Sequence, residues 1–181
     1  MADTAFTPKQ MLREISYGYV RAKAVYAAAK LGVADHVGEK PTAVSDLANK
    51  TGTNEQALYR LLRFLSGLGV FRETAAGEFS HSPVSEYLRS DHAYSERGAV
   101  ILRGEELYES FAEILHSIRT LETGFSKRFG NSLFGYLQGN EAAFNTFQAA
   151  MRSLTVFEAR AVMRAYDVSS FRKVVDVGGG S

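Results

Sequence analysis

The stretch that decides the fold is Val174-Val175-Asp176-Val177-Gly178-Gly179-Gly180-Ser181. Its β-branched run, closed by an acid and a glycine cluster, predicts the first strand of a nucleotide-type α/β sheet and the turn that leaves it. Glycines in such a turn let the backbone approach a ligand closely. The turn needs a following helix and further parallel strands, and the 181 residues contain none. The sequence therefore predicts a cofactor-binding enzyme in the form of a fragment. The alternative interpretation of Gly178 to Ser181 is an artificial Gly/Ser linker.

The composition is that of a folded protein with no charge bias. The chain is 45% hydrophobic, and its net charge is +1 from 21 basic and 20 acidic residues. This balance gives no electrostatic reason to expect a nucleic-acid or acidic-membrane partner. The chain has no cysteine, and its four histidines lie at no metal-ligand spacing, so we expect no metal. The polar N-terminus is no signal peptide, and no apolar run reaches the roughly 20 residues of a membrane span. We expect a cytoplasmic protein.

The N-terminal segment is predicted to form one helix that is apolar on more than one face. Apolar residues at steps of three and four indicate a helix over residues 7–30, with Thr7 as the N-cap. Tyr17, Val20 and Val25 lie off its main apolar stripe. A helix with one wet side does not need this extra apolar surface, whereas a helix packed against a second subunit does. We therefore expect a homodimer through this helix.

A helix-turn-helix pattern spans residues 42–71. Thr42 is predicted to cap a helix that ends at Lys50, and Thr53-Asn54-Glu55-Gln56 fits a capping box for the next helix. Residues 70–73 and 78–80, separated by a polar turn, indicate a two-stranded wing. A helix-turn-helix followed by such a hairpin is a winged helix.

The rest of the chain is predicted to be mainly helical. We expect a short helix over 82–88, helical segments from 97 to 121, a loop over 124–130, an apolar cluster over 133–137, a long helix from Glu141 to about Tyr166 capped by Gly139-Asn140, and one strand over 173–177.

Three separate segments, together with the glycine turn, make the chain resemble a known enzyme family. The matching segments are Leu31-Gly32-Val33-Ala34-Asp35, Leu58-Tyr59-Arg60-Leu61-Leu62-Arg63 with Gly69-Val70-Phe71, the block from Phe129 to Met151, and Val175-Asp176-Val177-Gly178-Gly179-Gly180. The chain resembles the N-terminal half of class I S-adenosylmethionine (SAM)-dependent O-methyltransferases of the caffeic-acid and bacterial natural-product type. The resemblance covers nearly the whole chain from about Met11.

The resemblance implies a winged-helix domain that forms an intertwined homodimer, a helical linker that forms one wall of the substrate pocket, and a Rossmann-like C-terminal domain that binds the methyl donor. For this chain it implies a mainly α fold. We expect a winged-helix dimerisation domain over residues 1–95 and a helical linker with the pocket wall over 96–170. Residues 171–181 would be the first strand and glycine turn of a truncated donor-binding domain of the Rossmann-like α/β type.

The resemblance also assigns site residues by position. Those that flank SAM are Phe134, Met151, Thr155, Asp176, Gly178, Gly179 and Gly180. Those that line the acceptor pocket are Ile101, Leu102, Phe147, Met151 and Leu154. The family's general base lies beyond Ser181, so no catalytic residue is named, and the 181-residue chain alone is expected to be inactive. The family often has histidine where this chain has Leu154, which puts a polar contact to the acceptor there in doubt.

The expected reaction is methyl transfer to a small aromatic or polyketide-like hydroxyl, without a metal. On spacing alone, Phe147, Met151 and Leu154 fit a buried core as well as a pocket. Two other classes of function stay open. One is a winged-helix DNA-binding regulator, disfavoured because residues 54–66 carry only Arg60 and Arg63 as bases. The other is a non-catalytic dimerisation subunit.

Overall fold

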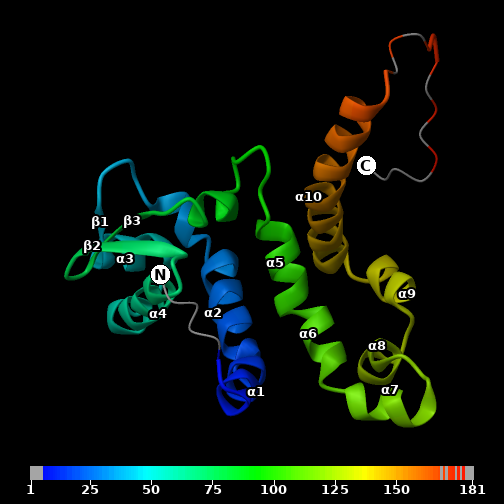
Figure 1. Cartoon of the computed structure of the whole chain (residues 1–181), viewed down its shortest axis with the longest axis horizontal. Helices are drawn as coiled ribbons and strands as arrows, with labels where there is room; N and C mark the ends of the chain where they lie inside the picture. Colours follow the sequence, from blue (N-terminus) through cyan, green and yellow to red (C-terminus); the bar gives the residue numbers. More distant parts are fainter. Residues whose placement is uncertain (1–5, 168, 170, 174, 176, 178–181) are drawn as a thin grey trace.

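The order of elements along the chain divides it into a helix-and-hairpin half and an all-helical half (Figure 1). The computed structural model describes residues 6–167, 169, 171–173, 175 and 177. The first half contains α1 (Pro8–Ser16), α2 (Gly18–Lys30), η1 (Val33–His36), β1 (Thr42–Ala43), α3 (Val44–Thr51), α4 (Glu55–Gly67), β2 (Phe71–Ala75), β3 (Glu78–His81) and η2 (Ser85–Leu88). The second contains α5 (Arg97–Gly104), α6 (Glu106–Phe111), α7 (Ile114–Thr120), α8 (Gly124–Phe129), α9 (Leu133–Gln138) and α10 (Glu141–Ala165). The predicted mainly helical character is confirmed.

The single N-terminal helix predicted over residues 7–30 is two helices. Thr7 is the N-cap as predicted, and its side chain and that of Gln10 form a capping box. α1 ends at Ser16, whose hydroxyl donates to the Arg13 carbonyl oxygen at 2.8 Å, and α2 begins anew at Gly18. The prediction of one helix was wrong because the hydrogen bond of Ser16 and the glycine at position 18 interrupt the helix, although the apolar spacing of the sequence continues across them.

The helix-turn-helix and its hairpin are present. β1, β3 and β2 form a three-stranded antiparallel sheet in that order. Thr42 does not cap α3, because it pairs with Phe79 in the sheet and its Oγ1 accepts from the Gly38 amide at 3.0 Å. The cap of α4 is Asn54, one residue after the predicted Thr53, and its Oδ1 accepts from the Ala57 amide at 3.0 Å.

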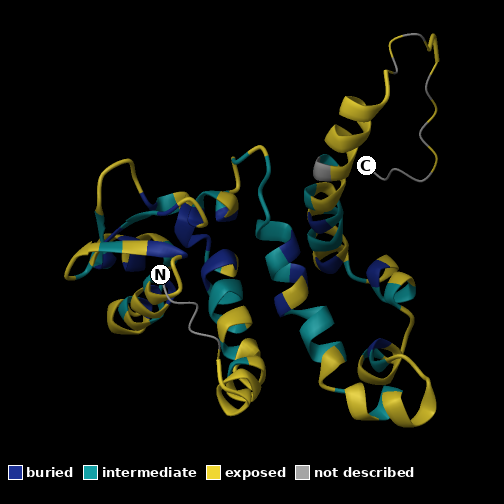
Figure 2. Cartoon of the chain, in the orientation of Figure 1, coloured by how far each residue is buried: buried dark blue, intermediate teal, exposed yellow. Residues whose placement is uncertain are grey.

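The main core of the chain lies where α2, α3, α4 and the sheet meet, and it appears as the dark blue faces on the left of Figure 2. Leu58, Leu62 and Leu65 of α4 are buried in it, as their spacing predicts, against Phe71 and Phe79 of the hairpin. These large side chains are almost fully removed from water, and such burial is the dominant stabilising term in a domain. This half therefore has its own core.

In the second half, α5 lies between α2 and α10, and α6 to α9 form an arm below them (Figure 1). The loop predicted over residues 124–130 is a helix, α8. The Thr123 hydroxyl caps it by accepting from the Ser126 amide at 3.1 Å. Phe125 and Phe129, four residues apart, pack their rings at 4.6 Å and both meet Tyr136 of α9. This aromatic packing stabilises a helix that the glycine-flanked sequence does not suggest.

The strand predicted over residues 173–177 is not formed at any described residue of that segment. Lys173, Val175 and Val177 have no strand conformation, and both valines are exposed. Val174 and Asp176 lie outside the described residues. An isolated strand has no neighbour for its backbone donors and acceptors, so a β-branched run alone does not produce one.

Candidate functional site

The scaffold of the site is the close crossing of α5 and α10. At Gly98, an added Cβ would lie 2.7 Å from the Ala149 Cβ, 2.8 Å from the Ala149 carbonyl carbon and 2.9 Å from the Ala150 nitrogen. Only a residue without a side chain lets the two helices come this near. Ala99 and Ala150 are buried beside the crossing. The small residues therefore bring larger side chains on both sides of the crossing within reach of each other.

On one side of this crossing lies an apolar wall, formed by Leu102, Leu107, Phe134, Phe147 and Met151. Leu102 is buried there, with Leu107, Phe147 and Met151 packed against the same cluster. The ring of Phe134, on α9, meets the ring of Phe147 edge-on at a centroid distance of 6.3 Å. The structure thus brings together four residues that the sequence assigned to the site, from three different helices. Leu107 is the member that sequence reasoning missed.

The wall is neither a closed core nor bare surface. Phe147 and Met151 are half-buried, while Phe134 is 68% exposed although it touches Phe147. A large aromatic ring left in water beside other apolar side chains is typical of a binding surface.

Leu154 and Thr155 extend the wall by one helical turn of α10. Leu154 is 41% exposed. The Thr155 hydroxyl is exposed and donates to the Met151 carbonyl oxygen at 2.8 Å, within its own helix. Ile101 is the exception among the predicted acceptor residues. It lies on the opposite side of α5 and lines a cavity on the other side of the crossing.

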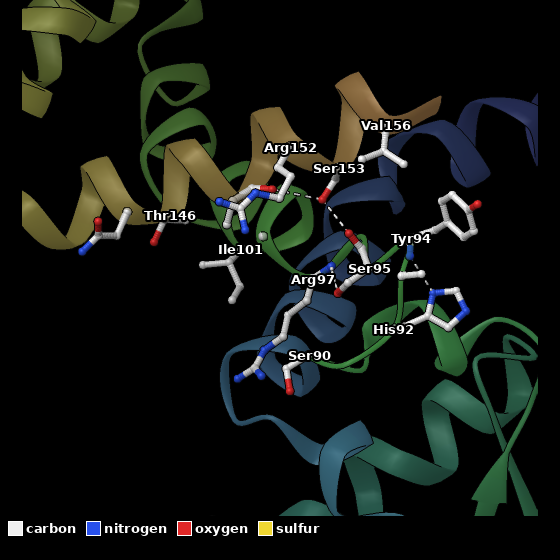
Figure 3. Close-up of a pocket in the computed structure, with 14 residues that line it drawn as sticks. Ser90, His92, Tyr94, Ser95, Arg97, Ile101, Thr146, Arg152, Ser153 and Val156 are labelled. Atoms are coloured by element: carbon white, nitrogen blue, oxygen red, sulfur yellow. Dashed lines mark hydrogen bonds between the residues drawn. The ribbon is translucent and has the colours of Figure 1, made fainter. Parts of the chain in front are cut away.

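That cavity, of ≈ 510 Å³, lies between α5, α10 and the connection that precedes α5 (Figure 3). The Ser153 hydroxyl donates to the Ser95 carbonyl oxygen at 2.5 Å and so joins α10 to this connection. No sequence motif predicts this cavity, because its polar residues come from two segments that lie far apart along the chain, residues 90–97 and 145–153. Its lining is Ser90, His92, Ala93, Tyr94, Ser95, Arg97, Gly98, Ile101, Asn145, Thr146, Ala149, Arg152, Ser153 and Val156.

Arg97 joins α5 to the first half of the chain. Its Nε donates to the Ala29 carbonyl oxygen at 2.9 Å, and its Nη1 lies 2.6 Å from Asp35 Oδ2. The other carboxylate oxygen of Asp35 accepts from the Ser90 amide at 2.6 Å. Asp35 closes the segment Leu31 to Asp35 on which the resemblance partly rested. In this structure the segment connects the two halves of the chain.

A second connection holds the bend between α5 and α6 against α2. The Tyr26 hydroxyl donates to Glu105 Oε1 at 2.8 Å, and Lys30 Nζ lies 2.7 Å from the same oxygen. Lys23 Nζ donates to the Gly104 carbonyl oxygen at 2.8 Å. Burial, together with the hydrogen bond and negative charge of Glu105, raises the pKa of Tyr26 to about 12.

The remaining predicted site residues, Asp176, Gly178, Gly179 and Gly180, lie outside the described residues. Within the described part of the chain, no group of three or more histidine or acidic side chains is arranged to hold a metal ion. None of the described helices is long and apolar enough to cross a membrane.

Two family models match the chain. The O-methyltransferase dimerisation domain matches residues 13–91, and the O-methyltransferase domain matches residues 108–181. A phenazine O-methyltransferase of Lysobacter antibioticus is 42% identical over 170 residues, which are 94% of this chain and 50% of that protein.

Solved structures agree with these matches. The structure of LaPhzM superposes with a TM-score of 0.88 at 40% identity, over 92% of this chain and 50% of that one. CalO1, a methyltransferase in calicheamicin biosynthesis in its SAH-bound form, superposes with a TM-score of 0.79 at 30% identity, over 97% of this chain and 54% of that one. The chain spans about half the length of the curated relatives it matches.

Proposed function

Since this chain belongs to the O-methyltransferase family, we propose that it is the dimerisation and acceptor-pocket portion of a SAM-dependent enzyme that methylates a hydroxyl of a small aromatic or polyketide-like natural product. The observation that carries the proposal is the apolar wall. Leu102, Phe147 and Met151 pack together beside the exposed ring of Phe134, and all but Leu102 lie in the segment that the O-methyltransferase model matches. A flat, apolar acceptor fits such a wall.

The described residues fit the methyl donor at one point. The exposed ring of Phe134 offers an aromatic face, and aromatic faces attract cations such as the sulfonium of SAM. When bound, SAM supplies a methyl group on a positively charged sulfur. Met151 and Thr155 follow on α10, and we propose that they flank the donor with Phe134. Asp176 and Gly178 to Gly180 remain the proposed contacts to its amino-acid portion.

Methyl transfer in this family is an in-line displacement, so the contribution of these residues is to position the reactants and exclude water. We propose that Leu102, Phe147, Met151 and Leu154 cover the acceptor ring and orient its hydroxyl. Ile101, which lines the cavity on the opposite side of α5, acts behind this surface by supporting the helix.

The test of activity is methyl transfer by the full-length native protein that carries these residues. It is incubated with SAM and a panel of small phenols, and with the methyl ethers of the same phenols as blocked controls. We expect a mass gain of one methyl group on the phenols alone. Phe134→Leu is expected to raise the KM for SAM several-fold, while Phe111→Leu, equally exposed on α6, leaves it unchanged. An equal response of the two variants would contradict the donor assignment.

We also propose that the chain forms a homodimer through α1 and the start of α2. Met11, Leu12, Ile15 and Tyr19 are all more than half exposed, with Ile15 at 72%. An exposed apolar face of this kind marks an interface, and it lies at the edge of the segment matched by the dimerisation model.

Light scattering at tens of micromolar tests the dimer. We expect twice the chain mass for the unmodified protein and the single-chain mass for Ile15→Asp. Val84→Asp places the same charge on another exposed apolar residue, away from α1, and is expected to remain dimeric. A monomeric unmodified protein would contradict the proposal.

The proposed division of the chain follows from these roles: a winged-helix dimerisation domain over residues 1–95, a helical linker and pocket wall over 96–170, and the start of a donor-binding domain over 171–181. The dimerisation model ends at residue 91, close to the first boundary. The segment matched by the dimerisation family model includes α3, α4 and the hairpin. The match therefore supports a role of these elements in dimerisation and gives no support to the DNA-binding alternative.

A further inference from the structure

We propose that Tyr26 is a positioning residue that sets the shape of the acceptor wall by fixing the bend between α5 and α6. The expected effect on the acceptor rests on the proposed function, whereas the bend itself is a feature of the fold. It makes α2 a determinant of acceptor fit, together with the helices that carry the wall.

The bend is a break in an otherwise continuous run of helix. Glu105 has φ −108° and ψ −107°, which is neither helical nor extended, so α6 leaves α5 in a new direction. Gly104 is buried against the Tyr26 ring, and an added Cβ at Gly104 would lie 2.3 Å from the Tyr26 Cγ and Cδ2. The aromatic ring therefore packs directly on the backbone of the bend.

Polar side chains of α2, the helix that carries Tyr26, also hold this geometry. Lys23 Nζ donates to the Gly104 carbonyl oxygen at 2.8 Å and lies over the rings of Tyr26 and Tyr108, at 4.2 Å and 4.8 Å from their centroids. The Tyr26 hydroxyl donates to Glu105 at 2.8 Å. Carbonyls at a helix end lack partners within the helix, and a cation placed there is favourable. The ring and the hydroxyl of Tyr26 and the cation of Lys23 thus converge on two consecutive residues, Gly104 and Glu105.

The bend separates two members of the apolar wall. Leu102 lies shortly before it on α5 and Leu107 shortly after it on α6, and both pack with Phe147 and Met151. A change in the direction of α6 moves Leu107 relative to Leu102 and so alters the surface presented to the acceptor. The proposed donor contacts Phe134, Met151 and Thr155 belong to α9 and α10, and neither helix is part of the bend. Loosening the bend is therefore expected to affect acceptor binding more than donor binding.

The first test is hydrogen exchange on the 181-residue chain, which needs no activity. Tyr26→Phe keeps the ring and removes the bond to Glu105. We expect amides of α6 to exchange about five- to tenfold faster, with α4 unchanged. Tyr166→Phe is the matched control, because it removes the same hydroxyl from a tyrosine that is 56% exposed and lies at the end of α10, away from the bend. Glu105→Gln keeps an oxygen for Tyr26 and is expected to behave like the unmodified chain, whereas Glu105→Ala should match Tyr26→Phe.

The second test measures kinetics of the full-length native protein. For Tyr26→Phe we expect the KM of a phenolic acceptor to rise about three- to tenfold, with the KM of SAM within twofold. Unchanged exchange in α6 would overturn the proposal, as would a rise in both KM values together. If no phenol is methylated by the unmodified protein, the proposed function fails; faster α6 exchange in Tyr26→Phe alone would then still support the role of Tyr26 at the bend.

Discussion

The crossing of α5 and α10 can be tested by adding a single methyl group. In Gly98→Ala, the new Cβ would lie 2.7 Å from the Ala149 Cβ and within 2.9 Å of two atoms of the α10 backbone. Flexible side chains can move away from such a contact, but a helix backbone cannot do so locally. We therefore expect the helices to separate, at the cost of about 1–3 kcal/mol that overpacking usually carries.

The gain in helix propensity from glycine to alanine offsets part of this cost, by up to about 1 kcal/mol. The net destabilisation expected is about 1–2 kcal/mol. For a chain of this size, 1 kcal/mol shifts the Tm by about 2–4 °C, so the Tm should fall by about 2–8 °C. Thermal unfolding followed by circular dichroism at the helical band measures it.

Gly67→Ala is the matched control. Gly67 is the last residue of α4, and no atom lies within 4 Å of an added Cβ there, so the Tm of this variant should stay unchanged or rise slightly. In the double variant Gly98→Ala with Ala149→Gly, one of the close atoms is removed while the backbone contacts remain, and glycine inside α10 loses about 1 kcal/mol of helix propensity, so the Tm should not return to that of the unmodified chain. A Tm of Gly98→Ala equal to or above that of Gly67→Ala would refute the reasoning.

Three further predictions follow from single side chains. Met151→Ala should lower the free energy of unfolding by about 1–2 kcal/mol, which is less than for a fully buried methionine because Met151 is half-buried. It should also change the ratio of kcat/KM values between different phenolic acceptors. Lost stability with an unchanged ratio would mean that Met151 has only a core role. Arg97→Ala should lower stability by about 1–2 kcal/mol in urea unfolding, because it removes the bonds to Ala29 and Asp35, and Arg97→Lys should recover only part of it. The pKa of Tyr26 is raised to about 12 in the folded chain, so the contribution of Tyr26 to stability is complete below pH 10 and is lost between about pH 10 and 12. The free energy of unfolding of Tyr26→Phe should therefore fall less over that window than that of the unmodified chain. An identical fall would contradict the assignment.

The helix-turn-helix, the hairpin and α10 could be predicted because their signals are local. Apolar residues at helical spacing, a capping side chain such as Asn140 and a polar turn between two short β-type runs act within a few residues of each other. The loop predicted at residues 124–130 was wrong for the opposite reason. The helix there depends on ring packing with Tyr136, which no local pattern records.

For the site, the family resemblance supplied Phe134, Leu102, Phe147 and Met151. Spacing alone places Phe147 and Met151 on one side of α10, and the structure brings Leu102 and Phe134 to them from other helices. Leu107, Tyr26 and the placement of Ile101 on the other side of α5 could not be predicted. Each depends on the direction of α5 relative to a helix distant in sequence. That direction is set by close contacts of two glycines with remote segments, at Gly98 with the backbone of α10 and at Gly104 with the side chain of Tyr26.

The sequence by itself determined most of the helical segments, the hairpin and the enzyme family, because periodicity, caps and motifs are properties of neighbouring residues. Only the tertiary structure decided which side chains share a surface. A helix can carry a suitable residue on any face, and close packing with distant helices selects the face that meets a ligand. In this chain two glycines without room for a Cβ make that selection, since they fix how near α5 approaches α10 and α2.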